Sequence, residues 1–204
     1  MNPYVPPSFR YSLRLLFLYL LLIFPVSALL SYRSAFENGP IENTQTAILL
    51  GGALLCVWFF RISHPGIRGM WLAVSGLFLL LSLRELSWGR VFFVERYTAD
   101  GPVILPAAEM PFYWEIHIAA GLLAAACLYG LIRCTPWRQI FHEFPLPRFH
   151  LVLFILCLIL VTLGDHHMMY HTLRDQTIEE LAELLMYCTL CHMAWYYHLL
   201  IRKR

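Results

Sequence analysis

Two histidines spaced by four residues in the segment GDHHMMYH (164–171) are the clearest candidates for metal chemistry in this sequence. On a helix, residues i and i+4 lie on one face, so the imidazoles of His167 and His171 could reach a single ion. Imidazole nitrogens suit zinc among the common divalent metals. Asp165, which precedes them, is expected to orient a ligand histidine through a hydrogen bond.

Carboxylates dominate the start of the next segment, TIEELAELLMY (177–187). At 100° per residue, Glu179, Glu180 and Glu183 share one polar helix face with Tyr187. Such a face inside a membrane needs a cation, protons or opposing arginines. The alternative is that Glu179 and Glu180 occupy the first turn of a helix, where the helix dipole favours negative charge. Glu183 lies deeper, so this alternative suits it poorly.

The stretch LRELSWGRVFF (83–93) places arginines and a glutamate at the end of an apolar run. In a regular helix Ser87 would lie between Arg84 and Arg90, and Glu85 would point to the other side. The arginines could hold a phosphate or stabilise an oxyanion, and Glu85 could act as a general base. The alternative is an ion-pair lock between helices, with Arg90 extending to the lipid headgroups.

The segments that carry these residues are long and apolar. The 204 residues are 59% hydrophobic and 14% charged, whereas soluble domains carry about 25% charge. The apolar residues form blocks of about 20, enough to cross roughly 30 Å of hydrocarbon. The sequence therefore predicts an all-α, polytopic membrane helix bundle, a single transmembrane domain over 1–204. The expected helices cover 11–32, 44–61, 69–93, 113–133, 149–171 and 177–200.

Basic residues predict the orientation of this bundle. Ten of the fifteen lie at the termini and in the connections between the second and third and between the fourth and fifth helices. By the positive-inside rule both termini are cytoplasmic. The first apolar stretch is too long for a signal peptide, so we expect an uncleaved span. The ten residues are Arg10, Arg14, Arg61, Arg68, Arg133, Arg138, Arg148, Arg202, Lys203 and Arg204.

This orientation places the polar residues of four helices at one depth. Glu85 lies near the outer end of the third helix and His117 in the first turns of the fourth. The histidines close the fifth helix, and the glutamates open the sixth. All lie roughly 3–12 Å beneath the outer surface at 1.5 Å per residue. Because charges in a membrane are costly, ionisable residues there are functional candidates by default.

The co-located residues predict a metal-dependent membrane enzyme, a hydrolase or transferase that acts on lipid-type substrates at the outer side. A divalent metal, zinc by its ligands, would be held by His167, His171 and one of His117, Glu180 or Glu183, and would activate a water. Glu85 or Glu183 would be the general base. The predicted metal ligands are His117, His167, His171 and Glu180, and the predicted catalytic residues are Arg84, Glu85, Arg90, Asp165 and Glu183.

Two other classes of function use the same polar layer. A transporter or binding protein for ions or protons would need a path to the cytoplasm, for which the sixth helix offers only Cys191, His192 and His198. In an assembly or scaffold subunit the layer would hold helices together, and the histidines would be interfacial residues. Membrane lipids are the expected partners in each case. The basic segments are short and fit membrane topology, so no nucleic-acid partner is expected.

Cysteine usage argues against a disulfide framework. None of the six cysteines falls in a predicted outer loop. Cys188 and Cys191 form a CxxC inside an apolar helix, where buried small hydrophobic residues are a better interpretation than a redox or metal pair.

The residues Glu85-Leu-Ser-Trp-Gly-Arg90, followed by Val-Phe-Phe, resemble a motif of bacterial inner-membrane proteins, Glu-(Ile/Leu)-Ser-Trp-Gly-(Gln/Arg) followed by an apolar aromatic pair. That group also carries acidic pairs that open its last helix, here Glu179-Glu180. The resemblance implies a bacterial inner membrane, with the outer side facing the periplasm. It assigns no activity.

A more distant similarity is to the membrane hydrolase superfamily that includes the alkaline ceramidases. Those enzymes use a serine, an aspartate and three histidines around a zinc ion just inside the membrane. Two departures stand out: that family has seven helices, and it carries HxxxH on its last helix, whereas this chain carries the pair on the fifth of six. The matching set here is Ser87, Asp165, His117, His167 and His171.

Overall fold

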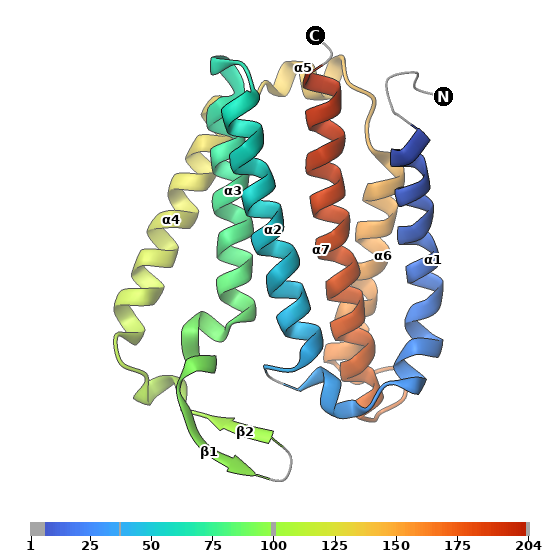
Figure 1. Ribbon diagram of the computed structural model, residues 1–204, viewed down its shortest axis with the longest axis vertical. Coiled ribbons are helices and arrows are strands. Elements are labelled where there is room, and N and C mark those ends of the chain that lie inside the picture. Colours follow the sequence, from blue (N-terminus) through green and yellow to red (C-terminus); the bar gives the residue numbers. More distant parts are fainter. Residues whose placement is uncertain (1–6, 37, 99–100, 203–204) are drawn as a thin grey trace. The chain divides into compact units, whose positions relative to one another are not determined.

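Six long apolar helices make up most of the computed structural model, which describes residues 7–36, 38–98 and 101–202 (Figure 1). Each is long and apolar enough to cross a membrane. The chain is therefore an all-α, multi-pass membrane protein, as predicted. The helices are α1 (Pro7–Leu29), α2 (Pro40–Ile62), α3 (Pro65–Glu85), α4 (Tyr113–Cys134), α6 (Arg148–Asp165) and α7 (Leu173–Arg202).

The chain divides into two compact units. Unit 1 comprises Met1–Ala35 and Pro136–Arg204, and unit 2 comprises Phe36–Thr135. The single domain expected over 1–204 stays a prediction, because each unit is described by itself. We call the end of each unit that the positive-inside rule predicts to face outward its outer end, and the opposite end its inner end. Of the basic residues used for that rule, Lys203 and Arg204 lie outside the described residues.

Unit 2 is built on α2, α3 and α4, which follow one another side by side (Figure 1). A proline stands at the first position of both α2 and α3, where its missing N–H costs no helical hydrogen bond. The hydroxyl of Ser75 donates a 2.9 Å hydrogen bond to the carbonyl of Ala53, which joins α3 to α2. The rings of Phe59 and Trp71 pack edge to face at 5.0 Å between the same helices.

Small residues let α3 and α4 approach closely, as is common in membrane bundles. A Cβ atom added to Gly69 would lie only 2.8 Å from the Cβ of Cys134, and one added to Gly130 would lie 3.1 Å from the Cβ of Ala73. Beside this contact, α2, α3 and α4 line an apolar groove of about 870 Å³. We call it the apolar groove of unit 2.

Between α3 and α4 the chain forms a small outer structure that the sequence pattern does not predict. It consists of the 3-10 helix η2 (Ser87–Phe92), strands β1 (Val94–Thr98) and β2 (Gly101–Ile104), and the 3-10 turn η3 (Ala107–Glu109). The strands pair antiparallel, with an irregularity between Val94 and Arg96. This structure positions the end of α3 against the start of α4.

Unit 1 is built on α7, which packs against both α1 and α6. A 3-10 turn, η1 (Tyr32–Ala35), follows α1, and a short helix, α5 (Trp137–His142), precedes α6. At Gly164 the backbones of α6 and α7 are so close that an added Cβ would lie 2.9 Å from the Asp175 carbonyl oxygen. Pro25 lies inside α1.

Candidate functional site

A polar pocket of about 300 Å³ lies at the outer end of unit 2. It is formed by the end of α3, by η2 and η3, and by the first turns of α4. Three predicted site residues, Arg84, Arg90 and His117, line it together. We call it the outer pocket, and its lining residues are Arg84, Ser87, Trp88, Arg90, Ala107, Met110, Tyr113 and His117.

The backbone after α3 explains how these side chains meet. The helix expected to continue to residue 93 ends at Glu85, and the prediction of a regular helix here is wrong. Ser87, Trp88 and Gly89 all have positive φ, at 46°, 57° and 92°. A run of left-handed residues cannot continue a right-handed helix, so the chain turns sharply. Ser87 and Arg90, which follow the end of α3, line the outer pocket together with Arg84.

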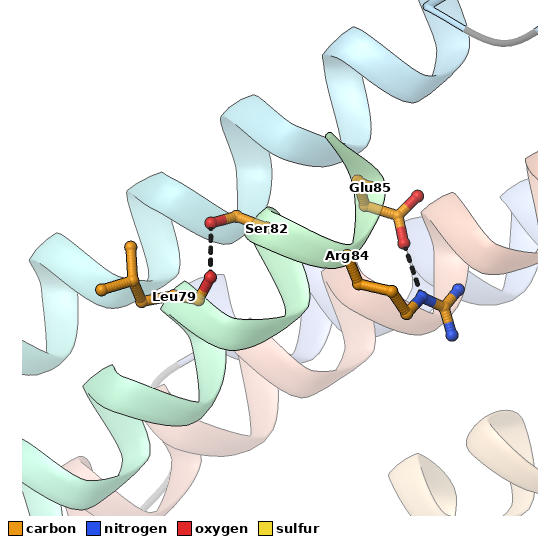
Figure 2. A network of polar contacts seen from close by, with 4 residues as sticks. All are labelled: Leu79, Ser82, Arg84 and Glu85. Carbon is orange, nitrogen blue, oxygen red and sulfur yellow. Dashed lines mark hydrogen bonds and ion pairs between the residues drawn. The ribbon is translucent and has the colours of Figure 1, made fainter. Parts of the chain in front are cut away.

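Glu85 is the partner of Arg84. Its side chain is only 5% exposed, and its Oε1 accepts a 3.1 Å hydrogen bond from the Nε of Arg84, as Figure 2 shows. Glu85 does not appear among the lining residues of the outer pocket. Its geometry therefore suits an ion-pair partner that orients the Arg84 guanidinium. The predicted role of Glu85 as a general base stays a prediction.

The hydrogen bonding of His117 indicates which of its ring nitrogens carries the proton. Its Nδ1 lies 2.8 Å from the backbone carbonyl of Tyr113, one turn earlier in α4. A carbonyl can only accept, so Nδ1 carries the proton and donates it. In the neutral imidazole Nε2 then holds a lone pair, which can accept a proton or bind a metal. The rings of Tyr113 and Trp88, at 4.2 and 5.6 Å, pack beside the imidazole.

The predicted histidine pair lies in unit 1, in a loop instead of a helix. The helix expected to reach residue 171 ends at Asp165. His167 and His171 have positive φ, at 50° and 55°. The argument that i and i+4 share a helix face therefore does not apply to this pair, and that part of the prediction is wrong. Asp165, His167 and His171 are all exposed.

A buried carboxylate that the sequence analysis did not select organises this loop. Asp175 is fully buried. Its Oδ2 accepts hydrogen bonds from the backbone N–H of His171 at 2.9 Å and of Tyr170 at 3.1 Å. The expected helix starts at 177, which leaves Asp175 in the preceding connection, whereas α7 starts at Leu173 and has Asp175 in its first turn, a favoured place for negative charge.

Arg174, beside it, ties the same loop to α1. Its Nη2 donates a 2.9 Å hydrogen bond to the carbonyl of Phe24, and its Nε lies 3.3 Å from the hydroxyl of Ser27. The guanidinium also lies 4.3 Å above the ring of Tyr170. Two charged side chains at the start of α7 thus hold the end of the loop that precedes this helix.

The glutamates of α7 lie further along the helix than predicted. Because α7 begins at Leu173, Glu179 and Glu180 fall beyond its first turn, and the first-turn alternative for them is wrong. Glu180 is half-buried and Glu183 is buried. Glu183 remains a candidate for a function in unit 1.

The predicted metal ligands are divided between the two units. His117 belongs to unit 2, whereas His167, His171 and Glu180 belong to unit 1. Within residues 7–36, 38–98 and 101–202, no three histidine, cysteine, aspartate or glutamate side chains are grouped so that they could hold a metal ion. The divalent metal therefore stays a prediction.

Comparison with known proteins found no match for this chain. No family model matches the chain, and neither a curated protein nor a solved structure matches it. The resemblance to the bacterial inner-membrane motif and the similarity to the alkaline ceramidase superfamily therefore stay predictions.

Proposed function

We propose that this protein binds a lipid-type amphiphile with an anionic headgroup in the outer pocket and acts on it as a hydrolase or transferase, with His117 as the proton acceptor. The observation that carries this proposal is the meeting of Arg84, Arg90 and His117 in one small pocket. The proposed location is a bacterial inner membrane, with the pocket on the periplasmic side.

The arginines support an anionic ligand. A guanidinium offers planar, bidentate hydrogen bonding that matches phosphate and carboxylate groups. Glu85 holds the guanidinium of Arg84 through its Nε. The terminal nitrogens of the Arg84 guanidinium are the atoms that would bind the ligand. Arg90 supplies a second positive charge to the same pocket.

The apolar groove of unit 2 supports an amphiphile over a small soluble anion. Its volume of about 870 Å³ is within the usual range of ligand sites. Groove and pocket share α3 and α4: Leu79 lines the groove and Arg84 the pocket. These positions are five residues, or about 7.5 Å, apart along α3. An acyl chain could therefore lie against the helices whose outer ends hold the headgroup.

His117 supports a reaction in addition to binding. Its Nε2 can take the proton of a water or of the Ser87 hydroxyl as that oxygen bonds to an ester carbon or phosphorus. The leaving oxygen then departs with a proton returned by the imidazole. The arginines would offset the negative charge that grows on the substrate oxygens during this step. Each role requires only residues that line the outer pocket.

Binding and turnover variants test the two halves of the proposal separately. With dihexanoyl phosphatidylglycerol as the probe, Arg84→Gln and Arg90→Gln should each weaken binding about tenfold or more, the loss expected for one charge-assisted contact. Arg96→Gln is the matched control, since Arg96 is exposed on β1 and is not a lining residue. Glycerophosphoglycerol, which is the same phosphodiester without the acyl chains, should bind more weakly than the lipid.

His117→Gln should keep the affinity for the probe and lose its turnover, followed as released fatty acid or headgroup by mass spectrometry. Gln can hydrogen-bond the carbonyl of Tyr113 but is no base at neutral pH. Unchanged affinity in both arginine variants would rule out the binding site. Unchanged turnover in His117→Gln would rule out the assigned proton acceptor.

A further inference from the structure

Three polar side chains form a continuous hydrogen-bonded row at the inner end of unit 1. The Oγ of Ser12 lies 2.6 Å from the Nε2 of His192, and the Nδ1 of His192 lies 2.7 Å from the Nε2 of His150. The residues come from α1, α7 and α6 respectively. None of them is part of the outer pocket, so the row is independent of the proposed function.

Aromatic side chains surround this row. The ring of Phe9 stacks on His192 at 3.9 Å, and the ring of Tyr196 lies 5.7 Å from His150. His150 is 2% exposed and His192 is 8% exposed. Hydrogen bonds in such an apolar setting are stronger than in water and polarise one another.

Ser12 is the member of the row that a substrate can reach. It is half-buried, and its neighbours on α1, Tyr11 and Leu15, are each 63% exposed. A membrane-spanning helix presents such apolar side chains to lipid. Ser12 thus lies beside the surface where the acyl chains of an amphiphile would pack.

The heavy atoms permit an arrangement in which Ser12 is activated. His192 can carry its proton on Nδ1 and donate it to Nε2 of His150, which leaves Nε2 of His192 to accept from the Ser12 hydroxyl. This is the logic of a serine, a base and a third group that orients the base. In the opposite arrangement the hydroxyl donates to the carbonyl of Phe9, 2.9 Å away.

Other helical serines show what is particular about Ser12. Ser82 on α3 also donates to the carbonyl three residues earlier, that of Leu79, at 2.8 Å (Figure 2). Ser27 on α1 does the same with Phe24. A hydrogen bond from a serine hydroxyl to a carbonyl one turn earlier is common in helices and by itself indicates no function. Ser12 adds a short contact with a buried imidazole whose other nitrogen is itself hydrogen-bonded.

We propose that Ser12 is a nucleophile for the acyl ester of an amphiphile at the inner end of unit 1, with His192 as its base and His150 as a positioning residue. The Oγ of Ser12 bonds to the carbonyl carbon, and its proton passes to Nε2 of His192. The alcohol leaves with that proton as the original ester bond breaks, and an acyl-serine forms. Water reverses the roles and releases the carboxylic acid.

A fluorophosphonate probe tests this on the purified full-length chain. The Ser12 oxygen would bond to phosphorus, fluoride would leave, and the proton would pass to His192. Peptide mass spectrometry should locate the adduct on Ser12. Labelling of Ser27 or Ser82 at the same rate, or no adduct on Ser12 in folded protein, would overturn the proposal.

Variants test the roles of His192 as the base and His150 as the positioning residue. His192→Gln should slow labelling of Ser12 at least tenfold, and Ser82→Ala, the matched control, should leave the rate unchanged. His150→Leu should also slow it, whereas His150→Gln should restore part of the rate, since its amide oxygen can accept from Nδ1 of His192. A merely structural His150 would show equal rates in both variants at equal thermal stability. An unchanged rate in His192→Gln would contradict the role of the base.

Discussion

A carboxylate inside a membrane helix needs a partner, and Glu85 has one in Arg84. This pair shows why residue type alone did not separate the possible roles of LRELSWGRVFF. The sequence pattern predicted Arg84, Arg90 and His117 as site residues because they share a depth, and the structure brings these three together. It did not predict that Glu85 would orient Arg84, because that depends on where the helix ends.

Residues far apart in the sequence were the hardest to connect. Ser12 and His192 are 180 positions apart in the sequence. No spacing rule relates them, since only the packing of α1, α6 and α7 puts them in contact. A single serine or histidine on such a helix is usually a satisfied structural residue, and nothing in the sequence marks these as different.

Gly89 is the residue on which the shape of the outer pocket depends most. Its φ of 92° is open to glycine and strained for other residues, while the nearest atom that an added Cβ would meet, on Met110, lies 3.7 Å away. Gly89→Ala should therefore lower stability by about 1–2 kcal/mol through backbone strain alone. Thermal unfolding in detergent measures this. Gly121→Ala on α4, where an added Cβ meets nothing within 4 Å, should be near neutral; equal effects would contradict the explanation.

Asp175 should matter more to stability than any of the predicted carboxylates around it. Asp175→Ala leaves the N–H groups of Tyr170 and His171 without their carboxylate partner, which should cost about 1–3 kcal/mol. Asp165→Ala, at an exposed position at the end of α6, should cost much less. Thermal unfolding of the two variants measures this difference in stability. A larger loss in Asp165→Ala would show that the loop is held differently.

At the scale of elements, hydropathy predicted where helices exist but not where they end. The expected 113–133 agrees closely with α4, Tyr113–Cys134. By contrast, α3 and α6 end at Glu85 and Asp165, well before the expected 93 and 171. Apolar residues continue past the first of these ends, so their pattern carries no signal for the turn. The strands β1 and β2 are too short and mixed for a periodicity argument.

The contact between α3 and α4 depends on glycine at particular positions. Gly69→Ala should disrupt it, since the new Cβ would lie 2.8 Å from the Cβ of Cys134. Gly66→Ala, three residues earlier on α3, meets nothing within 4 Å and serves as the control. We expect a drop in melting temperature in detergent for the first variant only. Equal melting temperatures would contradict the close approach of these helices.

For the whole molecule, composition and the length of the apolar blocks were sufficient to predict an all-α membrane bundle, because crossing hydrocarbon requires helices of about 20 residues. They did not predict the division into two units. The shared depth of polar residues in four helices describes only their position along the membrane normal. Depth alone cannot tell which of those residues meet.

The predicted metal is tested at this scale by elemental analysis of the purified protein beside a His167→Ala/His171→Ala variant. Because both histidines are exposed in the loop between α6 and α7, we expect their replacement to leave the metal content unchanged. About one zinc per chain that is lost in the variant would restore the metal-dependent enzyme as the leading hypothesis.

The measurement that tests the central claim most directly is the affinity ratio for dihexanoyl phosphatidylglycerol over dihexanoyl phosphatidylcholine, by calorimetry, in wild type and in Arg84→Gln/Arg90→Gln. If the outer pocket holds an anionic headgroup, the wild type should prefer phosphatidylglycerol by about tenfold or more, and the variant should lose that preference while still binding through the groove. Equal preference in wild type and variant would contradict the account.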